Sequence, residues 1–388
     1  MTLTDSFLIS HLKRLDNSCF TVTLHGKTWL IGKGEPQFSV TFRNSIPKKD
    51  LLTSTTLALG EAYMRGDLII EGDLFTALCA LLSQTDKLAL DRSALHGLLK
   101  QSHTETAQYG QISAHYDLGN DFYRLWLDPT MSYSCAYFKH DNDSLEEAQR
   151  NKVHYILQKL FLSKGLSLLD IGCGWGFLLL EAARWYGVNG RGCTLSRQQK
   201  AEGDSRILNE GLAGRLSISL LDYRELTKEG RVYDRLVSVG MLEHVGRENY
   251  PLYMQTAASL LKQGGLFLLH FIDGKTAESS NPWIQKYIFP GGTLPTPGEI
   301  ILLAVQCGFH VLDVESLRRH YEKTLLLWYK NFKARQKEII LMKGVPFTRM
   351  WELYLAGCAA AFHVGRIDVH QILLSKGVND DLPMIRWY

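Results

Sequence analysis

The stretch that decides the fold is "LLDIGCGWG", residues 168–176, in which an apolar run leads into three alternate glycines and then into the helical sequence "FLLLEAARWYG". Glycines at a strand-to-helix turn let a ligand approach the backbone closely, and the helix start offers unpaired N–H groups. The spacing is GxGxG rather than GxGxxG, and no acidic residue lies between Glu181 and Glu202 to hold a dinucleotide ribose. The loop therefore disfavours a dinucleotide and leaves two alternatives, another cofactor or a tight turn without a ligand.

Apolar strand candidates alternate with helical segments from about Gly165 onward. The candidates are "LSLLDIG", "VNGRGCTL", "LSISLLD", "DRLVSVGML" and "GLFLLHFI". This alternation predicts a parallel sheet with helices on both faces, a doubly wound α/β fold whose ligand binds at the carboxyl ends of the strands. Two later runs, "FHVLDVESL" and "IDVHQILLS", are expected to form a terminal antiparallel pair.

The N-terminal part has a different pattern. Residues 20–42 alternate apolar and polar side chains around glycine-containing turns, which is typical of antiparallel strands. Helices are expected around Leu57 to Met64 and Leu74 to Leu82. We predict a smaller α+β N-terminal domain at residues 1–98, a linker at 99–112 and a large α/β domain at 113–388.

The composition excludes several classes of protein. With 388 residues, 45% of them hydrophobic, the chain can bury an ample core, and a net charge of +3 from 43 basic and 40 acidic residues gives no indication of nucleic-acid binding. The start "MTLTDSFLISHLKRLD" does not resemble a signal peptide, and there is no apolar run of membrane-spanning length. Seven cysteines without a CxxC pair disfavour a zinc site and a disulfide framework. We expect a cytoplasmic protein with no metal site.

One basic segment stands out, "HYEKTLLLWYKNFKARQKEII" at residues 320–340. On a continuous helix, Lys323, Lys330, Lys333 and Lys337 would share one face. Two interpretations remain open, a packed helix with a solvated lysine face and a helix that docks on an anionic membrane.

The glycine loop has the form D-x-G-x-G-x-G, which resembles motif I of S-adenosylmethionine-dependent methyltransferases. The resemblance implies that Asp170 contacts the methionine end of the cofactor or orders the loop, and that Gly172 and Gly174 admit its backbone. By position along the following strands, the resemblance also implies contacts to ribose and adenine from Thr194, Ser196, Gln199, Asp222 and Tyr223.

Five blocks in order make the resemblance more specific: "HYDLGNDFYRLWLDPTMSYSCAYF", "LLDIGCGWG", "GMLEHVG", "LLHFI" and "HYEKTLLLWY". Together they resemble the cyclopropane-fatty-acid synthase family, and the N-terminal domain resembles the branch that modifies membrane phospholipids. This implies a Rossmann-like class I methyltransferase domain that transfers a methylene from S-adenosylmethionine to the cis double bond of unsaturated phospholipid acyl chains. The implied product is a cyclopropane ring, formed through a carbocation that bound bicarbonate deprotonates. A homodimer is implied as well. Peripheral docking on a phospholipid membrane is a hypothesis that rests on the basic helix and on a lipid-associated N-terminal domain, and electrostatic docking predicts that anionic lipids are favoured.

The resemblance also implies a catalytic set. Cys135, Glu243, His270 and Tyr321, with the backbone of Ile272, would hold the bicarbonate, Glu243 accepting its O–H and the other side chains donating. Cys135 or His270 could instead be a packed core residue, and Tyr321 could serve only as a helix cap. Tyr133 and Ser134 would contact the carboxylate or amino end of the cofactor, and Tyr137, Trp283 and Phe289 are candidates to shield the cation. In "HFIDGK", Phe271 and Asp273 replace smaller or hydroxylated residues of the family pattern, which puts the shape of the loop around Ile272 in doubt.

Two other functions remain as alternatives. One is a fatty-acyl C-methyltransferase with a methyl-branched or methylene product. The other is a non-catalytic lipid-binding homologue, whose mark would be the loss of a site residue, and no site residue of the pattern is lost.

Overall fold

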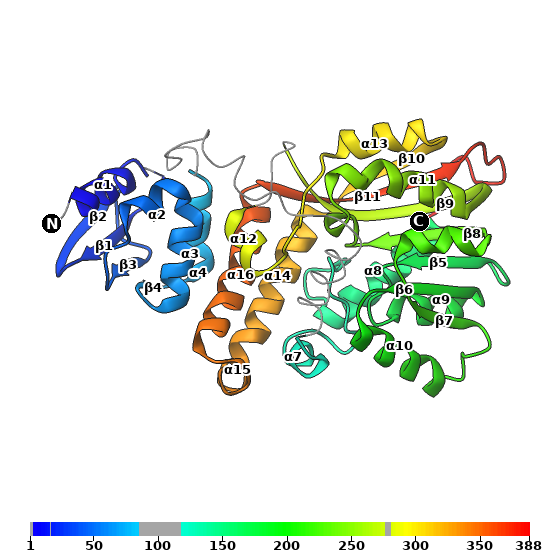
Figure 1. Cartoon of the computed structure of the whole chain (residues 1–388), viewed down its shortest axis with the longest axis horizontal. Coiled ribbons are helices and arrows are strands. Elements are labelled where there is room, and N and C mark those ends of the chain that lie inside the picture. The colour runs from blue at the N-terminus through cyan, green and yellow to red at the C-terminus, as the bar shows by residue number, and fades with distance from the viewer. Residues whose placement is uncertain (1–2, 16, 85–117, 276–280) are drawn as a thin grey trace. The chain divides into compact units, whose positions relative to one another are not determined.

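The computed structural model describes residues 3–15, 17–84, 118–275 and 281–388 (Figure 1). The chain divides into two compact units, and each is built from three separate segments. The first unit contains Met1–Gln101, Ser279–Pro290 and Leu325–Arg366, and the second contains Ser102–Glu278, Gly291–Thr324 and Ile367–Tyr388. The predicted linker at 99–112 lies outside the described residues, and the predicted domain boundaries stay a prediction.

The second unit is built on a seven-stranded sheet with the order β10-β11-β9-β8-β5-β6-β7. The strands are β5 (Ser167–Ile171), β6 (Asn189–Thr194), β7 (Leu216–Leu220), β8 (Tyr233–Val239), β9 (Leu261–Gly274), β10 (Phe309–Ser316) and β11 (Ile367–Lys376). The pairs from β9 to β7 are parallel, and β11 pairs antiparallel with both β9 and β10. The predicted doubly wound fold and its terminal antiparallel pair are both confirmed.

Helices cover both faces of this sheet (Figure 1). Alternate strand residues enter two separate cores: Leu168 and Leu268 pack with α8 (Leu145–Lys159) and α9 (Phe177–Tyr186), whereas Leu169 and Leu269 pack with α11 (Tyr250–Leu260) and α13 (Pro297–Gln306). Burial on both faces is why the strands read as nearly continuous apolar runs. The unit also contains α7 (Asn120–Arg124), α10 (Arg197–Asn209) and the 3-10 helices η1 (Tyr223–Glu229), η2 (Leu242–His244) and η3 (Arg247–Asn249).

The strand order places the ligand edge. From β5 the chain proceeds to β6 and β7 on one side, and then returns to β8 and β9 on the other side. Such a reversal opens a crevice at the carboxyl ends of the central strands. The glycine loop lies at that edge because it directly follows β5.

The first unit contains a four-stranded sheet with the order β2-β1-β3-β4. Its strands are β1 (Phe20–Leu24), β2 (Lys27–Ile31), β3 (Ser39–Phe42) and β4 (Leu68–Glu71). The expectation of antiparallel strands across residues 20–42 is correct for β1 and β2 but wrong for β3, which pairs parallel to β1. The reason is that residues 32–38 carry the chain back along the hairpin, so that β3 runs in the direction of β1.

Helices from both ends of the sequence complete the core of the first unit. The early helices are α1 (Leu3–Leu12), α2 (Lys48–Thr53), α3 (Thr55–Arg65) and α4 (Leu74–Leu82), and α3 and α4 confirm the two predicted helical stretches. The later helices are α12 (Pro282–Tyr287), α15 (Gln336–Lys343) and α16 (Val345–His363). Ala356 of α16 is fully buried among Phe20, Val22 and other residues of the N-terminal sheet. In the described residues, no helix combines the length and the apolar character needed to cross a membrane.

The basic segment forms two helices rather than one. α14 (Arg318–Ala334) ends before Arg335, whose φ of −105° and ψ of 12° leave the helical region, and α15 then begins. Lys337 therefore belongs to α15, and the prediction that four lysines share one face of a single helix is wrong. Lys323 donates to the backbone oxygen of Asp141 at 2.7 Å, and Lys333 pairs with Glu352 at 2.6 Å.

Candidate active site

The glycine loop adopts a backbone that only glycine accepts easily. Gly172 and Gly174 have φ values of 83° and 54°. A Cβ added at Gly172 would lie 2.9 Å from Cγ of Met241, so this position also needs the missing side chain for space. The loop is tied to α7, because Trp175 donates its indole N–H to Asn120 Oδ1 at 2.9 Å.

The loop forms one wall of a cavity of about 140 Å³ at the carboxyl edge of the sheet. Nine of the ten residues predicted to bind the cofactor line this cavity: Tyr133, Ser134, Asp170, Gly172, Gly174, Thr194, Gln199, Asp222 and Tyr223. The tenth, Ser196, is buried and caps α10 by accepting a hydrogen bond from the backbone N–H of Gln199.

The turn after β6 is held by its own polar groups. The hydroxyl of Thr194 lies 2.7 Å from Gln199 Oε1 and accepts the backbone N–H of Ser196 at 3.2 Å. After β7, the carboxylate of Asp222 accepts the backbone N–H and the Nε–H of Arg224 at 2.9 and 2.8 Å. These contacts fix the side chains that face the cavity before any ligand binds.

Lys152 is a cavity residue that sequence reasoning missed. It extends from α8, is only 3% exposed, and its Nζ donates to Ser134 Oγ at 2.8 Å. Burial lowers the pKa of Lys152 to about 8 and raises the pKa of Asp170 to about 7, an effect that the nearby Lys152 opposes. The available signal was a lysine on the apolar face of an amphipathic helix, where a charge must have a partner.

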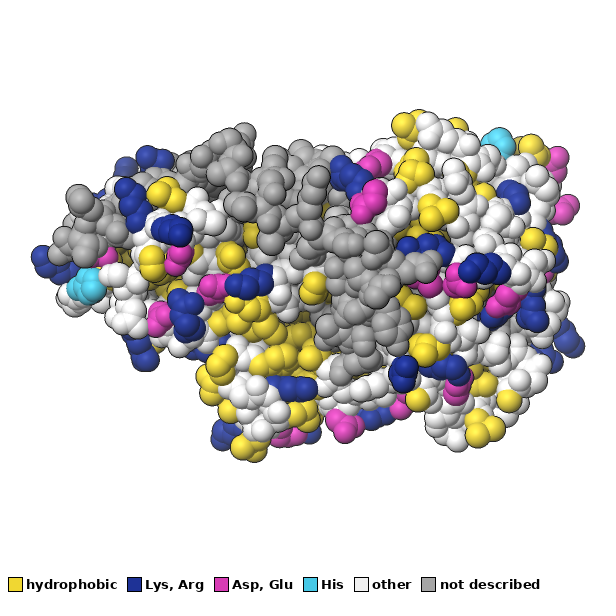
Figure 2. Space-filling model, in the orientation of Figure 1, with side chains coloured by type: hydrophobic (Ala, Val, Ile, Leu, Met, Phe, Trp, Pro, Cys, Tyr) yellow, Lys and Arg dark blue, Asp and Glu magenta, His cyan; other side chains and the backbone are white. Residues whose placement is uncertain are grey.

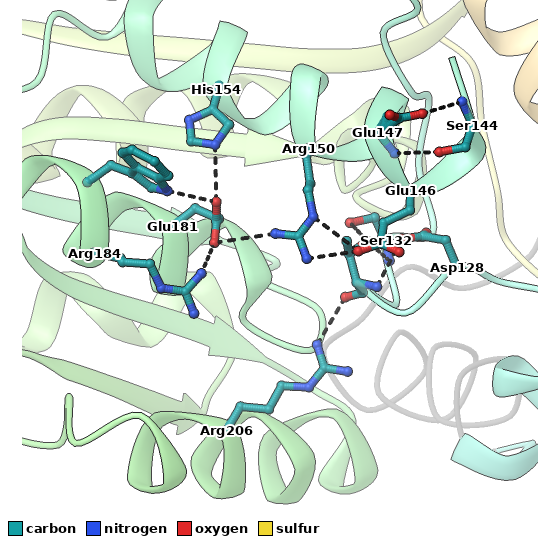
Figure 3. Close-up of polar contacts among 12 residues, drawn as sticks. Asp128, Ser132, Ser144, Glu146, Glu147, Arg150, His154, Glu181, Arg184 and Arg206 are labelled. Atoms are coloured by element: carbon teal, nitrogen blue, oxygen red, sulfur yellow. Dashed lines mark hydrogen bonds and ion pairs between the residues drawn. The ribbon is translucent and has the colours of Figure 1, made fainter. Parts of the chain in front are cut away.

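A polar network joins the elements around the cavity (Figure 3). Glu181 of α9 is buried, and His154 and Arg150 of α8 reach it at 3.1 and 3.9 Å. Arg206 of α10 donates to the backbone oxygen of Thr130 at 3.0 Å, just before the segment that carries Tyr133 and Ser134 (Figure 3). The buried Glu181 therefore ties α8 to α9, and Arg206 separately ties α10 to the segment after Thr130.

Glu243 and Ile272 are brought together. Glu243 lies in η2, just after β8, and its Oε1 accepts the backbone N–H of Ile272 at 2.7 Å. Its second oxygen, Oε2, is buried and has no hydrogen-bond partner among the described residues. Burial raises the pKa of Glu243 to about 7. The next two residues of the chain, His244 and Val245, line the cavity.

His270 lies on β9, two residues before Ile272, and is 1% exposed. Its Nε2 also lacks a hydrogen-bond partner within the described part of the chain, while Nδ1 contacts Gln371 Nε2 at 3.2 Å. Burial lowers the pKa of His270 to about 3, so the ring is neutral at pH 7. Glu243 Oε2 and His270 Nε2 are thus both buried, and neither has a protein partner in the described residues.

Cys135 is a fully buried thiol. Its Sγ lies 3.2 Å from the backbone oxygen of Ala136 and 3.8 Å from that of Leu317, and burial raises its pKa. The backbone N–H of Ala136 donates to Thr324 Oγ1 at 3.0 Å, which anchors this segment to the part of α14 that carries the buried Tyr321. All seven cysteines are described and none forms a disulfide, and no cluster of metal ligands occurs in the described residues.

Electrostatics link the catalytic candidates to the cavity. Lys152 is close enough to Cys135 and His270 to lower the pKa of each, and it acts on Asp170 as well. Lys152 lines the cavity, whereas Cys135 and His270 do not.

The two departures from the family pattern have partners in this chain. Phe271 is buried in the core on the opposite face of the sheet, and Asp273 pairs with His370 at 2.5 Å. Ile272 lies within β9, paired with Val369 of β11, so the doubt about a distorted loop is resolved in favour of a regular strand.

The aromatic candidates separate between the units. Tyr137 belongs to the second unit and stacks between Tyr155 and His320, with ring centroids 4.4 and 4.6 Å away. Trp283 and Phe289 belong to the first unit. Whether all three shield a cation stays a prediction.

Comparison with known proteins gives the same family over most of the chain. Residues 103–372 match the family model described as mycolic acid cyclopropane synthetase, and residues 7–93 match a domain of unknown function. A probable fatty acid methyltransferase of Pseudomonas putida is 40% identical over 84% of this chain and 85% of its own length. The cyclopropane-fatty-acyl-phospholipid synthase of Escherichia coli K12 is 39% identical over 87% of this chain and 88% of its own.

Solved structures agree with this result. The mycolic acid cyclopropane synthase CmaA1, complexed with SAH and CTAB, is 38% identical and superposes with a TM-score of 0.65 over 69% of this chain and 98% of its own. A coclaurine N-methyltransferase, at 20% identity and a TM-score of 0.66, shares the fold alone. With the methyltransferase fold, the glycine loop and these relatives in agreement, the chain belongs to the mycolic acid cyclopropane synthetase family, as the sequence motifs predicted.

Proposed function

We propose that this protein uses S-adenosylmethionine to convert the cis double bond of unsaturated phospholipid acyl chains into a cyclopropane ring. The observation that carries the proposal is the pair of buried atoms without protein partners in the described residues, Glu243 Oε2 and His270 Nε2. A buried polar atom without a partner costs about 1–3 kcal/mol, so this pair favours a ligand with hydrogen-bonding groups.

Bicarbonate fits this set of groups. It carries one O–H and two acceptor oxygens, so Glu243 can accept the O–H while neutral His270 and the buried Tyr321 and Cys135 donate. When bound, S-adenosylmethionine supplies the methyl group that becomes the ring carbon, and bicarbonate supplies the base that takes a proton from it. The contribution of the chain is to hold these groups dry and fixed, because water would trap a cation on the acyl chain as an alcohol.

The cavity supports the cofactor part of the proposal. Asp170 and Lys152 give it one acidic and one basic group, which suit the amino and carboxylate groups of a methionine moiety. Asp222 and Tyr223 lie at the end of β7, where an adenosine would extend. The relative CmaA1, whose structure holds SAH, supports the same reading.

A fatty-acyl C-methyltransferase is a second candidate. Two relatives, 40% and 37% identical, are described as probable fatty acid methyltransferases. Both activities require the same methyl transfer to an alkene, and they differ in which proton is lost afterwards. The product therefore decides between them.

Mass spectrometry of lipids after incubation with S-adenosylmethionine, bicarbonate and vesicles of cis-unsaturated phospholipid tests the proposal. We expect a gain of one CH2 with loss of the alkene, and at least a 100-fold smaller yield for Glu243→Gln. Exposed Glu248, five residues later, gives the matched control Glu248→Gln, which should retain activity. A gain of one CH2 with an alkene retained would favour the C-methyltransferase, and no gain although cofactor binds would favour the lipid-binding homologue.

We also propose a docking surface for an anionic membrane on α15 rather than along α14. Leu341 and Met342 of α15 are 88% and 47% exposed, and Val345 at the start of α16 is 51% exposed. Lys337 and Lys343 lie beside them in sequence. Figure 2 shows apolar and basic side chains intermixed where Figure 1 has α15. Apolar side chains that can insert, with basic ones that attract anionic headgroups, are typical of peripheral membrane helices. A cytoplasmic location at the membrane and a homodimer complete the proposal, and light scattering of the purified protein tests the dimer.

A further inference from the structure

Three side chains from neighbouring strands form a row across the sheet of the second unit: His270 on β9, Gln371 on β11 and Glu315 on β10. Gln371 is the direct cross-strand partner of both His270 and Glu315. Residues directly opposite each other on adjacent strands project to the same face. His270 and Gln371 are each 1% exposed, so their contact is shielded from water.

Lys159, the last residue of α8, fixes the orientation of the glutamine. It is 1% exposed, and its Nζ lies 3.0 Å from Gln371 Oε1 and 2.5 Å from Glu315 Oε2. An ammonium group has donors only, so the Gln371 atom that faces it must be the carbonyl oxygen. The amide NH2 of Gln371 is therefore the group that faces His270.

This orientation determines where the imidazole proton lies. The amide nitrogen of Gln371 lies 3.2 Å from His270 Nδ1. An amide NH2 only donates, so Nδ1 must be the acceptor and the ring proton of a neutral imidazole must sit on Nε2.

We propose that Lys159 and Gln371 are positioning residues that hold His270 as the neutral Nε2–H tautomer, which makes Nε2–H a donor to a bound oxyanion. The low pKa of His270 agrees with a neutral ring, because burial disfavours the imidazolium. A buried N–H without an acceptor is costly, and Nε2 has no acceptor among the described residues. The identity of the anion as bicarbonate rests on the proposed function, whereas the tautomer does not.

The tautomer can be read by NMR of the full-length protein labelled with 15N-histidine, with His270 assigned by its absence in His270→Asn. At pH 7.5 we expect a protonated Nε2 and an unprotonated Nδ1. Because an isolated neutral imidazole also favours Nε2–H, the discriminating variant is Gln371→Glu. The carboxylate introduced by this substitution would still pair with Lys159, but it would accept a hydrogen bond from Nδ1 of His270. A proton should therefore appear on Nδ1, and the yield of modified lipid should fall at least 10-fold.

Two further variants keep the test decisive. Ser375→Ala lies on the same strand, removes a hydrogen bond to the backbone oxygen of Gly377, and should leave both the tautomer and the activity unchanged. If Gln371→Glu does not fold, Gln371→Leu removes the donor to Nδ1 and should lower the lipid yield without preventing cofactor binding.

The possible results separate this inference from the proposed function. A wild-type His270 with its proton on Nδ1, or a Gln371→Glu protein with Nδ1 still unprotonated, would overturn the positioning role. The expected NMR pattern in a protein that modifies no lipid would support the positioning role and would count against the proposed function.

Discussion

Replacing Lys152 by methionine should make the ligand-free protein more stable and its cofactor binding weaker. Burial lowers the pKa of Lys152 from 10.5 to about 8. At pH 7 the ammonium is thus about 3 kcal/mol less favourable, relative to the neutral amine, in the folded protein than in the unfolded chain. Methionine removes this cost at similar length, but it also removes the charged hydrogen bond to Ser134, which is worth about 1.5–3 kcal/mol. The free energy of unfolding should therefore rise, by at most about 1.5 kcal/mol.

The pH dependence gives this prediction a second signature. Between pH 8 and 10.5 the unfolded chain binds the Lys152 proton while the folded protein does not, so the contribution of this group to wild-type stability rises with pH. The advantage of Lys152→Met should accordingly shrink from pH 7 to pH 10. Urea unfolding at both pH values measures it, and the exposed Lys164→Met serves as the matched control.

Calorimetric titration with S-adenosylhomocysteine measures the predicted loss of cofactor binding by Lys152→Met. Lys152 lines the cavity beside Ser134 and Asp170, so its loss should weaken binding by about 10-fold or more. A free energy of unfolding for Lys152→Met more than about 1 kcal/mol below that of the wild type at pH 7, or binding of the ligand equal to that of the wild type, would refute the reasoning. Lys164→Met should match the wild type in both assays.

Three further predictions follow from the site and the surface. Because the pKa of Glu243 is raised to about 7, and its carboxylate must be ionised to accept the O–H of bicarbonate, activity should rise from pH 6 to pH 8. A flat activity profile would contradict this role of Glu243. The contribution of the same group to the free energy of unfolding should fall as the pH rises from 4.5 to 7. Gly172→Ala should abolish cofactor binding and destabilise the protein by about 1–3 kcal/mol. Gly211→Ala should destabilise it less, because Gly211 has a similar positive φ but open space where the new Cβ would lie. Equal effects of the two substitutions would show that crowding by Met241 is unimportant. Leu341→Asp should weaken sedimentation with phosphatidylglycerol vesicles several-fold, whereas Leu208→Asp, on a leucine of α10 that is 70% exposed, should not. Loss of binding in both variants would indicate a nonspecific effect of charge.

Much of the fold could be predicted from local pattern. Strands buried on both faces leave long apolar runs, and the glycines after β5 mark the ligand edge, so the doubly wound sheet could be predicted from local pattern. The resemblance to the family implied ten cofactor-binding residues, and nine of these line the cavity. Ser196 shows the limit of this reasoning, because a serine before a helix suits a ligand contact and an N-cap equally well, and here it caps α10.

The missed features depend on contacts distant in sequence. The parallel pairing of β3 with β1 and the break between α14 and α15 are not visible in periodicity alone. Lys152 and Gln371 were not among the predicted site residues, and their burial against Ser134 and His270 indicates a role. A sequence pattern shows which side chains are apolar, but it does not show which polar ones the fold surrounds.

The place of β11 in the sheet has a consequence for how the protein is made. Gln371 is synthesised about 100 residues after His270, because β11 is the last strand of the chain and yet lies between β9 and β10. At translation rates of about 5–20 residues per second, β9 and β10 wait several seconds with unpaired edges while α14 to α16 emerge. Exposed apolar edges of this kind invite aggregation. Expression that slows synthesis of residues 317–366 should therefore lower the soluble yield, and a chaperone that covers strand edges should restore it.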